Sequence, residues 1–266
     1  MTSLARMLAI LDLFDEGAST WTAEGIAGHL DYSVPTSYRY VRELGEAGLL
    51  RRDAGGTYML GPRVIELDHR IRVGDPLLNA GRGIMRDLAD ATGYDVVLGT
   101  IYGARIITIA QEHGTEVVSA TYGRGRRMPL FRGMLSKSIL AILPRARLRR
   151  LHLRHLAEAQ ATDFARSFEI LVAELKTIRS AGYCVTHGEL DQGLVGIAVP
   201  LASNAHRIIA SLGMVVTRRS YAAANAEQLA AMLVTAARKM VQALPSVATG
   251  IDKAPAAAHT KTGQPV

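Results

Sequence analysis

The chain has 266 residues, of which 48% are hydrophobic, and a formal net charge of +7. This length is enough for two modest domains with buried cores, and no apolar run is long enough to span a membrane. The single cysteine, Cys184, excludes an internal disulfide and any metal site built from several cysteines. We expect a cytoplasmic protein with no membrane partner, no metal ion and no cofactor.

Three helices are predicted in the first 48 residues. Apolar residues recur at helical spacing over residues 4–14, and Thr22 is placed to cap a second, short helix. A third helix follows a tight turn: Ser33 is expected to cap it by accepting a backbone N–H, Pro35 fits its first turn, and Gly48 ends it. This order is typical of a helix-turn-helix, in which the last helix enters a DNA groove. Taken alone, the third helix also fits an ordinary amphipathic helix with a solvated polar face.

The third helix is crowded with hydroxyl, aromatic and guanidinium groups. Val41 and Leu44 form its apolar stripe, and the polar groups are expected on the opposite side. Such groups are the ones that contact phosphates and base edges in double-stranded DNA. The candidate DNA-contacting residues of this helix are Thr36, Ser37, Arg39, Tyr40 and Arg42.

Residues 49–60 predict a β-hairpin around the glycine-rich turn at residues 54–56. A hairpin directly after the third helix is a wing, and its Arg51 and Arg52 are candidates to contact a phosphate or the minor groove. Residues 1–75 contain eight basic and eleven acidic side chains, a net charge of −3. The overall charge of this part therefore gives no support for DNA binding, and the prediction depends on the local clustering of arginines.

The first domain is expected to span residues 1–61. Glycine and proline at residues 61–62 and 74–76 break the chain, and residues 62–76 are expected to form a connector that is part helix and part hinge. Residues 77–244 predict an α+β domain with helices covering an antiparallel sheet. Residues 245–266, rich in Pro, Ala, Thr and Lys, predict a disordered tail. The expected strands are 96–101, 105–111, 117–122, 183–187, 195–201 and 207–217, and the expected helices are 77–92, 134–143, 148–156, 164–181 and 222–244.

Several segments, in this order, resemble IclR-family bacterial transcription regulators. They are SLARMLAILDLF, GEAGLLRRD, GGTYMLGPRVIEL, RDLADATGYDVVL, MPLFRGMLSKSILAILP and GYCVTHGELDQGLVGIAVPL. The resemblance extends from about Leu4 to Leu244. It implies a winged helix-turn-helix domain, joined by a helix to an effector-binding domain of GAF-like shape. It also implies homodimers or homotetramers that bind a pseudo-palindromic operator.

The resemblance also implies site residues. It places DNA contacts at Thr36, Ser37, Arg39, Arg42 and Arg51, whereas Pro35 replaces a serine that is frequent in the family and so removes a possible phosphate contact. The implied effector pocket is lined by Met134, Leu135, Thr186, Gly196, Gly213 and Val215.

The lining of this pocket indicates the type of effector. In family members that bind small carboxylic acids several of these positions are polar, whereas here most are small or apolar. We therefore expect a bulkier carboxylic acid, such as an aromatic one, whose carboxylate can use free N–H groups at the start of the Met134 helix. His187 and Glu189 are adjacent to the pocket and are possible hydrogen-bond partners of a ligand, whereas Lys137 is expected to be a structural or interface residue.

Two other functions stay open. The second domain could serve only for oligomerisation, or, less favoured, the chain could be an enzyme acting on a small acid. An enzyme needs a convergent nucleophile, base or metal set, and we find none: His152 and His155 lack a third ligand, and Cys184 and His187 point to opposite faces of a strand.

The positive charge is concentrated in one stretch of the second domain. Residues 117–157 include ten basic side chains, all within residues 124–154, and no acidic one. A solvated surface is the default interpretation. Attraction of an anionic effector, a second contact with DNA and pairing with acids of another subunit are the alternatives.

Overall fold

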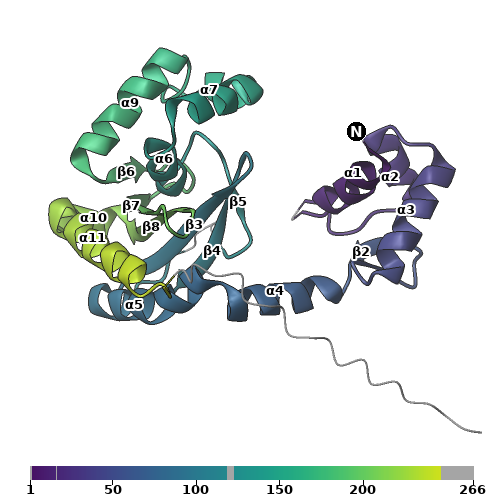
Figure 1. The fold of residues 1–266 in the computed structure, drawn as a ribbon, viewed down its shortest axis with the longest axis horizontal. Coiled ribbons are helices and arrows are strands. Elements are labelled where there is room, and N and C mark those ends of the chain that lie inside the picture. The colour runs from purple at the N-terminus through teal and green to yellow at the C-terminus, as the bar shows by residue number, and fades with distance from the viewer. Residues whose placement is uncertain (1, 16, 119–122, 247–266) are drawn as a thin grey trace, which may run out of the picture. The chain divides into compact units, whose positions relative to one another are not determined.

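The computed structural model describes residues 2–15, 17–118 and 123–246. The chain divides into two compact units, residues 1–75 and the residues from Pro76 onward (Figure 1). Helix α4 belongs to the first unit, although the sequence predicted a separate connector there. No helix among the described residues is long and apolar enough to cross a membrane.

The first unit is a winged helix-turn-helix, as predicted. Its core contains large apolar side chains from the 3-10 turn, the second and third helices and the hairpin, namely Ile10, Ile26, Val41, Leu44 and Leu50, whereas α4 adds none. The two strands pair antiparallel. The elements are α1 (Ser3–Ala9), a 3-10 turn (Ile10–Leu13), α2 (Ala23–Leu30), α3 (Val34–Glu46), β1 (Leu50–Arg52), β2 (Tyr58–Leu60) and α4 (Arg63–Gly74).

The residues predicted from the sequence to cap or end the helices of this unit do so, with one exception. Thr22 caps α2 by accepting the Gly25 N–H at 3.0 Å, and Gly48 follows α3 with a φ of 73°. The exception is Ser33, which precedes α3 but does not cap it with its side chain. Its hydroxyl lies 2.8 Å from Thr36 Oγ1 instead, because two neighbouring hydroxyls can satisfy each other.

The second unit is built on a six-stranded antiparallel sheet in the order β5-β4-β3-β8-β7-β6. The strands are β3 (Asp95–Tyr102), β4 (Arg105–Glu112), β5 (Arg127–Met128), β6 (Cys184–His187), β7 (Leu194–Ser203) and β8 (Ile208–Thr217). The helices are α5 (Pro76–Thr92), α6 (Met134–Ala141), α7 (Arg145–Arg154), α8 (Leu156–Gln160), α9 (Phe168–Ala181), α10 (Arg218–Ala223) and α11 (Ala226–Gln242).

Helices cover both faces of this sheet (Figure 1). On one face, α5 and α11 pack against Val96, Leu98 and other alternate residues of the central strands. On the other face, α6 packs against Val97 and Val215, which point the opposite way along their strands. Because both faces are covered, the central strands are buried at most of their positions. This arrangement confirms the predicted α+β domain.

The differences from the predicted elements have local causes. The predicted helix over 164–181 begins only at Phe168, because the Ser167 hydroxyl caps it by accepting the Ile170 N–H. The predicted helix over 222–244 is divided into α10 and α11, because Asn225 caps the second of them. Residues 117–118 of the predicted strand 117–122 are not in a strand, and its residues 119–122 lie outside the described residues, as does the predicted tail from residue 247.

Candidate functional site

Two of the predicted DNA contacts, Ser37 and Tyr40, are wrong because both side chains lie in the core of the first unit. Ser37 is fully buried and donates its hydroxyl hydrogen to the Ala23 carbonyl oxygen at 2.7 Å. Tyr40 is 4% exposed, and its hydroxyl lies 2.8 Å from that of Ser3. Residues 37, 40, 41 and 44 are three or four positions apart, so Ser37 and Tyr40 share the inward face of α3 with Val41 and Leu44.

The outward face of α3 holds Thr36, Arg39 and Arg42. Thr36 is half-buried, and both arginines are exposed. The Arg39 guanidinium lies 5.2 Å from the centre of the Tyr40 ring, so Tyr40 supports an arginine on the surface. Arg42 Nη2 lies 3.4 Å from Glu43 Oε1, and Arg42 Nε lies 3.7 Å from Glu46 Oε1. These pairs are exposed and weak, which leaves the Arg42 guanidinium able to exchange a carboxylate for a phosphate.

Tyr38 connects α3 to α2 on the exposed side. Its hydroxyl donates to Glu24 Oε1 at 2.6 Å. This hydrogen bond lowers the pKa of the Glu24 carboxyl and raises the pKa of the Tyr38 hydroxyl. The two helices are therefore joined both inside, through Ser37, and outside, through Tyr38.

The wing is anchored through β2 and within its turn. The backbone N–H of Tyr58, the first residue of β2, donates to the Trp21 carbonyl at 2.7 Å, which attaches β2 to the segment before α2. At the tip, Asp53 accepts the Thr57 N–H and the Thr57 hydroxyl, each at 2.8 Å. Arg51 and Arg52 are exposed on β1, and the Arg52 Nε lies 3.5 Å from the Gly56 carbonyl oxygen. Both wing arginines are therefore at the surface.

The residues predicted to line an effector pocket come together between α6 and the sheet. Met134, Leu135, Thr186 and Gly196 line a hollow whose free volume is only about 10 Å³, far below the several hundred Å³ that are typical of ligand pockets. The predicted residues Gly213 and Val215 lie beneath the Met134 side chain, in the small core that Met134 shares with Leu135.

Met134 fills the floor of this hollow, and glycines make room for it. A Cβ atom on Gly196 would lie 2.5 Å from the Met134 sulfur, and one on Gly213 would lie 3.0 Å from the Met134 terminal methyl. The hollow is therefore closed in this conformation, and a ligand of aromatic size needs the flexible Met134 side chain to change rotamer.

The mouth of the hollow is formed by the tip of the β6–β7 hairpin. Glu189 at this tip pairs with Lys137 of α6, with 2.5 Å between Oε1 and Nζ. Its other carboxylate oxygen accepts the Gly133 N–H at 2.9 Å, and Arg132 donates to the Glu189 carbonyl oxygen. Leu190 lies over Gly133. Sequence reasoning missed the place of Lys137 and Leu190 here, because only the fold brings the hairpin tip onto α6.

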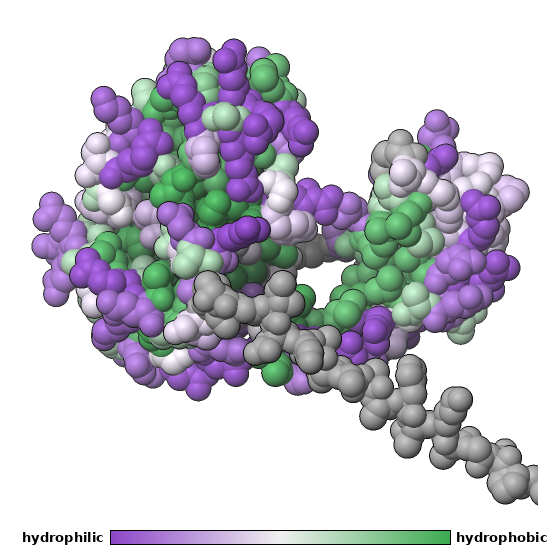
Figure 2. Space-filling view, in the orientation of Figure 1, coloured by the Kyte–Doolittle hydropathy of each residue, from purple (hydrophilic) through white to green (hydrophobic). Residues whose placement is uncertain are grey.

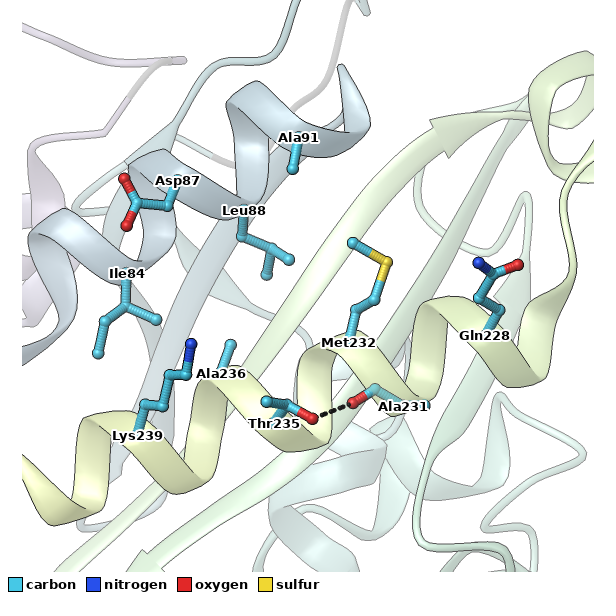
Figure 3. A pocket seen from close by; sticks show the side chains of 10 residues that line it. All are labelled: Ile84, Asp87, Leu88, Ala91, Gln228, Ala231, Met232, Thr235, Ala236 and Lys239. Carbon is cyan, nitrogen blue, oxygen red and sulfur yellow. Dashed lines mark hydrogen bonds between the residues drawn. The ribbon is translucent and has the colours of Figure 1, made fainter.

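A second hollow lies on the opposite face of the sheet, between α5 and α11 (Figure 3). It is an open groove with an apolar bed that includes Ile84, Leu88 and Met232, and Asp87 and Lys239 also line it. No residue predicted from the sequence to bind an effector lies in this groove. Its openness and position distinguish it from the closed hollow at α6.

The basic stretch of residues 124–154 contributes most of its exposed charge through α7. Arg145, Arg149, Arg150 and Arg154 are exposed on this helix, whereas Arg147 donates to the Gly103 carbonyl oxygen at 3.2 Å. His152 of the same helix is buried between the rings of Phe131 and Phe168, with its Nε2 2.8 Å from the Ala165 carbonyl oxygen. Across the described residues, no group of three His, Cys, Asp or Glu side chains could hold a metal ion.

Two family models match the chain. The IclR helix-turn-helix domain matches residues 3–54, and the bacterial transcriptional regulator IclR C-terminal domain matches residues 73–242. The Pca regulon regulatory protein of Pseudomonas putida is 28% identical over 80% of this chain and 74% of its own length. The HTH-type transcriptional regulator XynR of Escherichia coli is 29% identical over 80% of this chain and 84% of its own length.

Solved structures share the fold at lower identity. An IclR transcriptional regulator from Alicyclobacillus acidocaldarius superposes with a TM-score of 0.76 and 22% identity, covering 91% of this chain and 98% of that one. An IclR homologue from Microbacterium hydrocarbonoxydans, solved as a complex with 4-hydroxybenzoate, superposes with a TM-score of 0.74 and 22% identity, covering 91% and 99%. Together with the two matched domains, the winged helix-turn-helix and the α+β domain identify this chain as a member of the IclR family of bacterial transcriptional regulators, with a DNA-binding helix-turn-helix domain.

Proposed function

We propose that this regulator binds operator DNA through the outward face of α3 and the wing, under the control of a carboxylic acid effector bound between α6 and the sheet. The observation that carries the DNA part is the separation of the two faces of α3. The hydroxyls of Ser37 and Tyr40 point inward, and the guanidinium groups of Arg39 and Arg42 remain outside, followed by those of Arg51 and Arg52 on the wing. A guanidinium binds a guanine edge or a phosphate through paired N–H groups.

Selection of binding sites from random DNA duplexes, followed by affinity measurements on the selected site, tests this proposal. We expect Arg39→Ala to weaken specific binding by about 1–3 kcal/mol and to relax the base preference at one position, if Arg39 contacts a base edge. A phosphate contact would instead weaken binding to all sequences alike. Arg86→Ala is the control, because this exposed arginine of the second unit pairs only with Glu112 in the contacts described here. Equal losses in both variants would contradict the proposal.

The proposed effector is an aromatic carboxylic acid. The support is the apolar, glycine-floored hollow around Met134, and the fold is shared with a homologue that was crystallised with 4-hydroxybenzoate. Calorimetry with 4-hydroxybenzoate, benzoate and glyoxylate tests the size class. We expect the aromatic acids to bind and to shift operator affinity. Tight binding of glyoxylate alone would contradict the aromatic class.

The groove between α5 and α11 is the alternative effector-binding site. Two substitutions distinguish this groove from the hollow at α6. Gly196→Ala places a methyl group against the Met134 sulfur and is expected to abolish binding at α6. Ala231→Phe fills the groove, which Ala231 lines from an exposed position. Loss of effector binding in the Ala231 variant but not in the Gly196 variant would show that the effector binds in the groove and not at α6.

We also propose that the protein acts as a homodimer. Helix α4 has no buried residue, and its Leu67 and Ile71, one turn apart, are 40% and 53% exposed. On α1, Leu4 and Leu8 are 62% and 45% exposed, and Figure 2 shows hydrophobic residues gathered over this side of the first unit. A second copy of the chain is the partner that would cover such surface and place two recognition helices about 34–36 Å apart, one turn of DNA.

In this proposal the effector acts by linkage. An acid that binds one arrangement of the second domains better than another shifts the population toward that arrangement, and with it the spacing of the DNA-binding domains. The alternative is a second domain that only oligomerises. Its signature would be an operator affinity and a melting temperature that no tested acid changes.

A further inference from the structure

Glu189 and Asp191 of the hairpin tip line the hollow proposed to hold the effector. Glu189 places one oxygen on the Lys137 ammonium and the other on the Gly133 N–H. Lys137 does not itself line the hollow, so a ligand in the hollow could contact it only after Glu189 has left it. The side chains of Lys137 and Glu189 are only 12% and 26% exposed, so this ion pair is largely shielded from water. Removal of one partner from an ion pair in such a place, without a replacement, is costly because it leaves the other charge buried and unpaired.

The hairpin tip that carries Glu189 is a short loop bounded by two glycines. Gly188 and Gly193, with φ of 61° and 84°, stand at its two ends, and the Gly188 N–H donates to the Leu194 carbonyl at 2.8 Å to close the loop. Beyond this base, two carboxylate bonds, the Arg132 bond and the packing of Leu190 over Gly133 hold the tip to the start of α6. The Gly193 carbonyl also accepts the Arg218 N–H at 2.7 Å. The bonds to Lys137, Gly133 and Arg132 can be lost without breaking the paired part of β6 and β7.

We propose that Glu189 is an internal substitute for the effector's carboxylate, and that an acid enters the pocket by exchanging with it on Lys137. This inference rests on the proposed effector function. The exchange conserves charge at the buried site, because Lys137 has a carboxylate partner before and after it and Glu189 moves to water. Lys137 stays in place during the exchange, because its ammonium also lies 4.4 Å from the centre of the Phe164 ring.

The exchange explains the chemical class of the ligand. A neutral molecule of the same shape cannot replace the Glu189 charge on Lys137, so it would leave a buried ammonium without an ionic partner. The pocket therefore selects acids over their amides or esters. The apolar floor around Met134 and Gly196 then selects among acids by their size and polarity.

Two measurements on full-length Glu189→Gln and Glu112→Gln test the inference. Glu112 pairs with Arg86 on the surface of the same unit, so its variant controls for the loss of a carboxylate. Without any ligand, we expect amide hydrogen exchange at Gly133 and over residues 188–194 to become faster in Glu189→Gln only. With 4-hydroxybenzoate, we expect binding at least about tenfold tighter in that variant, because a neutral amide competes weakly for Lys137, and no gain for 4-hydroxybenzamide.

A second variant guards against misfolding of Glu189→Gln. Leu190→Ala weakens the closure without changing any charge and is expected to increase exchange and tighten 4-hydroxybenzoate binding in the same direction. Unchanged exchange and unchanged affinity in both variants would overturn the inference. Faster exchange with no binding of any acid in any variant would instead contradict the proposed effector class, while leaving Glu189 as the group that closes the hollow.

Discussion

The Ser37 hydroxyl joins α3 to α2 by donating to the Ala23 carbonyl oxygen at 2.7 Å in the core of the DNA-binding domain. Both residues are buried, at 0% and 2% exposure, so no water can replace this bond. The bond fixes the position of the recognition helix relative to the helix before it. A polar residue that looks like a DNA contact in the sequence is thus part of the scaffold that orients the proposed contacts, Arg39 and Arg42.

Ser37→Ala should therefore destabilise the protein and leave its DNA contacts intact. We expect a loss of about 0.5–1.5 kcal/mol in the free energy of unfolding, because a buried hydrogen bond between the two helices is removed. Below the unfolding transition, operator affinity should change far less than in Arg39→Ala. Denaturant unfolding and operator-binding measurements on Ser37→Ala and Arg39→Ala check this prediction. Loss of DNA binding without loss of stability in Ser37→Ala would show that Ser37 contacts DNA after all.

Met134→Ala should enlarge the effector pocket at the expense of stability. Met134 is 4% exposed and fills the space above Gly196 and Gly213, so its truncation should cost about 2–5 kcal/mol. The cavity should then admit a bulkier acid, such as a naphthoate, that the unaltered pocket binds poorly. Calorimetry with benzoate and 2-naphthoate measures the change in preference. Parallel weakening for both acids would show that Met134 does not set the size limit.

The sequence was sufficient for the architecture and insufficient for the mouth of the pocket. Helical spacing and glycine positions located α3 and the wing, and strand periodicity located most of the sheet. The same helical spacing places Ser37 and Tyr40 on the buried face with Val41 and Leu44. Their hydroxyl groups nevertheless suggested solvent-exposed side chains, which placed both residues among the predicted DNA contacts. The pairing of Lys137 with Glu189 joins residues 52 positions apart. No local pattern encodes such a contact, and it depends on how the β6–β7 hairpin tip packs on α6.

The wing turn should lose its anchor in acid. The hydroxyl of Thr57, and then its N–H, lower the pKa of the Asp53 carboxyl from its ordinary value of 3.8. A pKa lowered by folding means that the unfolded chain binds the proton more readily, so the contribution to stability is full above pH 3.8 and is lost as the pH falls through the folded value. An NMR titration of the Asp53 carboxyl carbon and the Thr57 amide should show a common midpoint below 3.8. A midpoint at or above this value would contradict the anchor.

Cys184 should be chemically inert in the folded protein. Burial raises the pKa of its thiol from 9.0 to about 12, so almost no thiolate forms at neutral pH. Because folding raises this pKa, the contribution of the neutral thiol to stability is complete below pH 9 and is lost as the pH rises toward 12. At pH 8 a disulfide reagent should modify Cys184 only after denaturation. Rapid modification of the native protein would show that β6 is more accessible than the structure indicates.

The exposed apolar side chains of α4 should be required for pairing of two chains. We expect a double substitution, Leu67→Glu and Ile71→Glu, to weaken dimerisation by more than about 100-fold, since burial of two such side chains contributes about 1.5–3 kcal/mol each. Both residues are more than a third exposed within a single chain, so the fold of that chain should be little affected. Analytical ultracentrifugation measures the dimer, and binding to full and half operator sites measures its consequence. Because a monomer holds one half-site only, the variant should lose the preference for the full site. Retention of both the dimer and this preference would place the pairing surface elsewhere, with the groove between α5 and α11 the next surface to test.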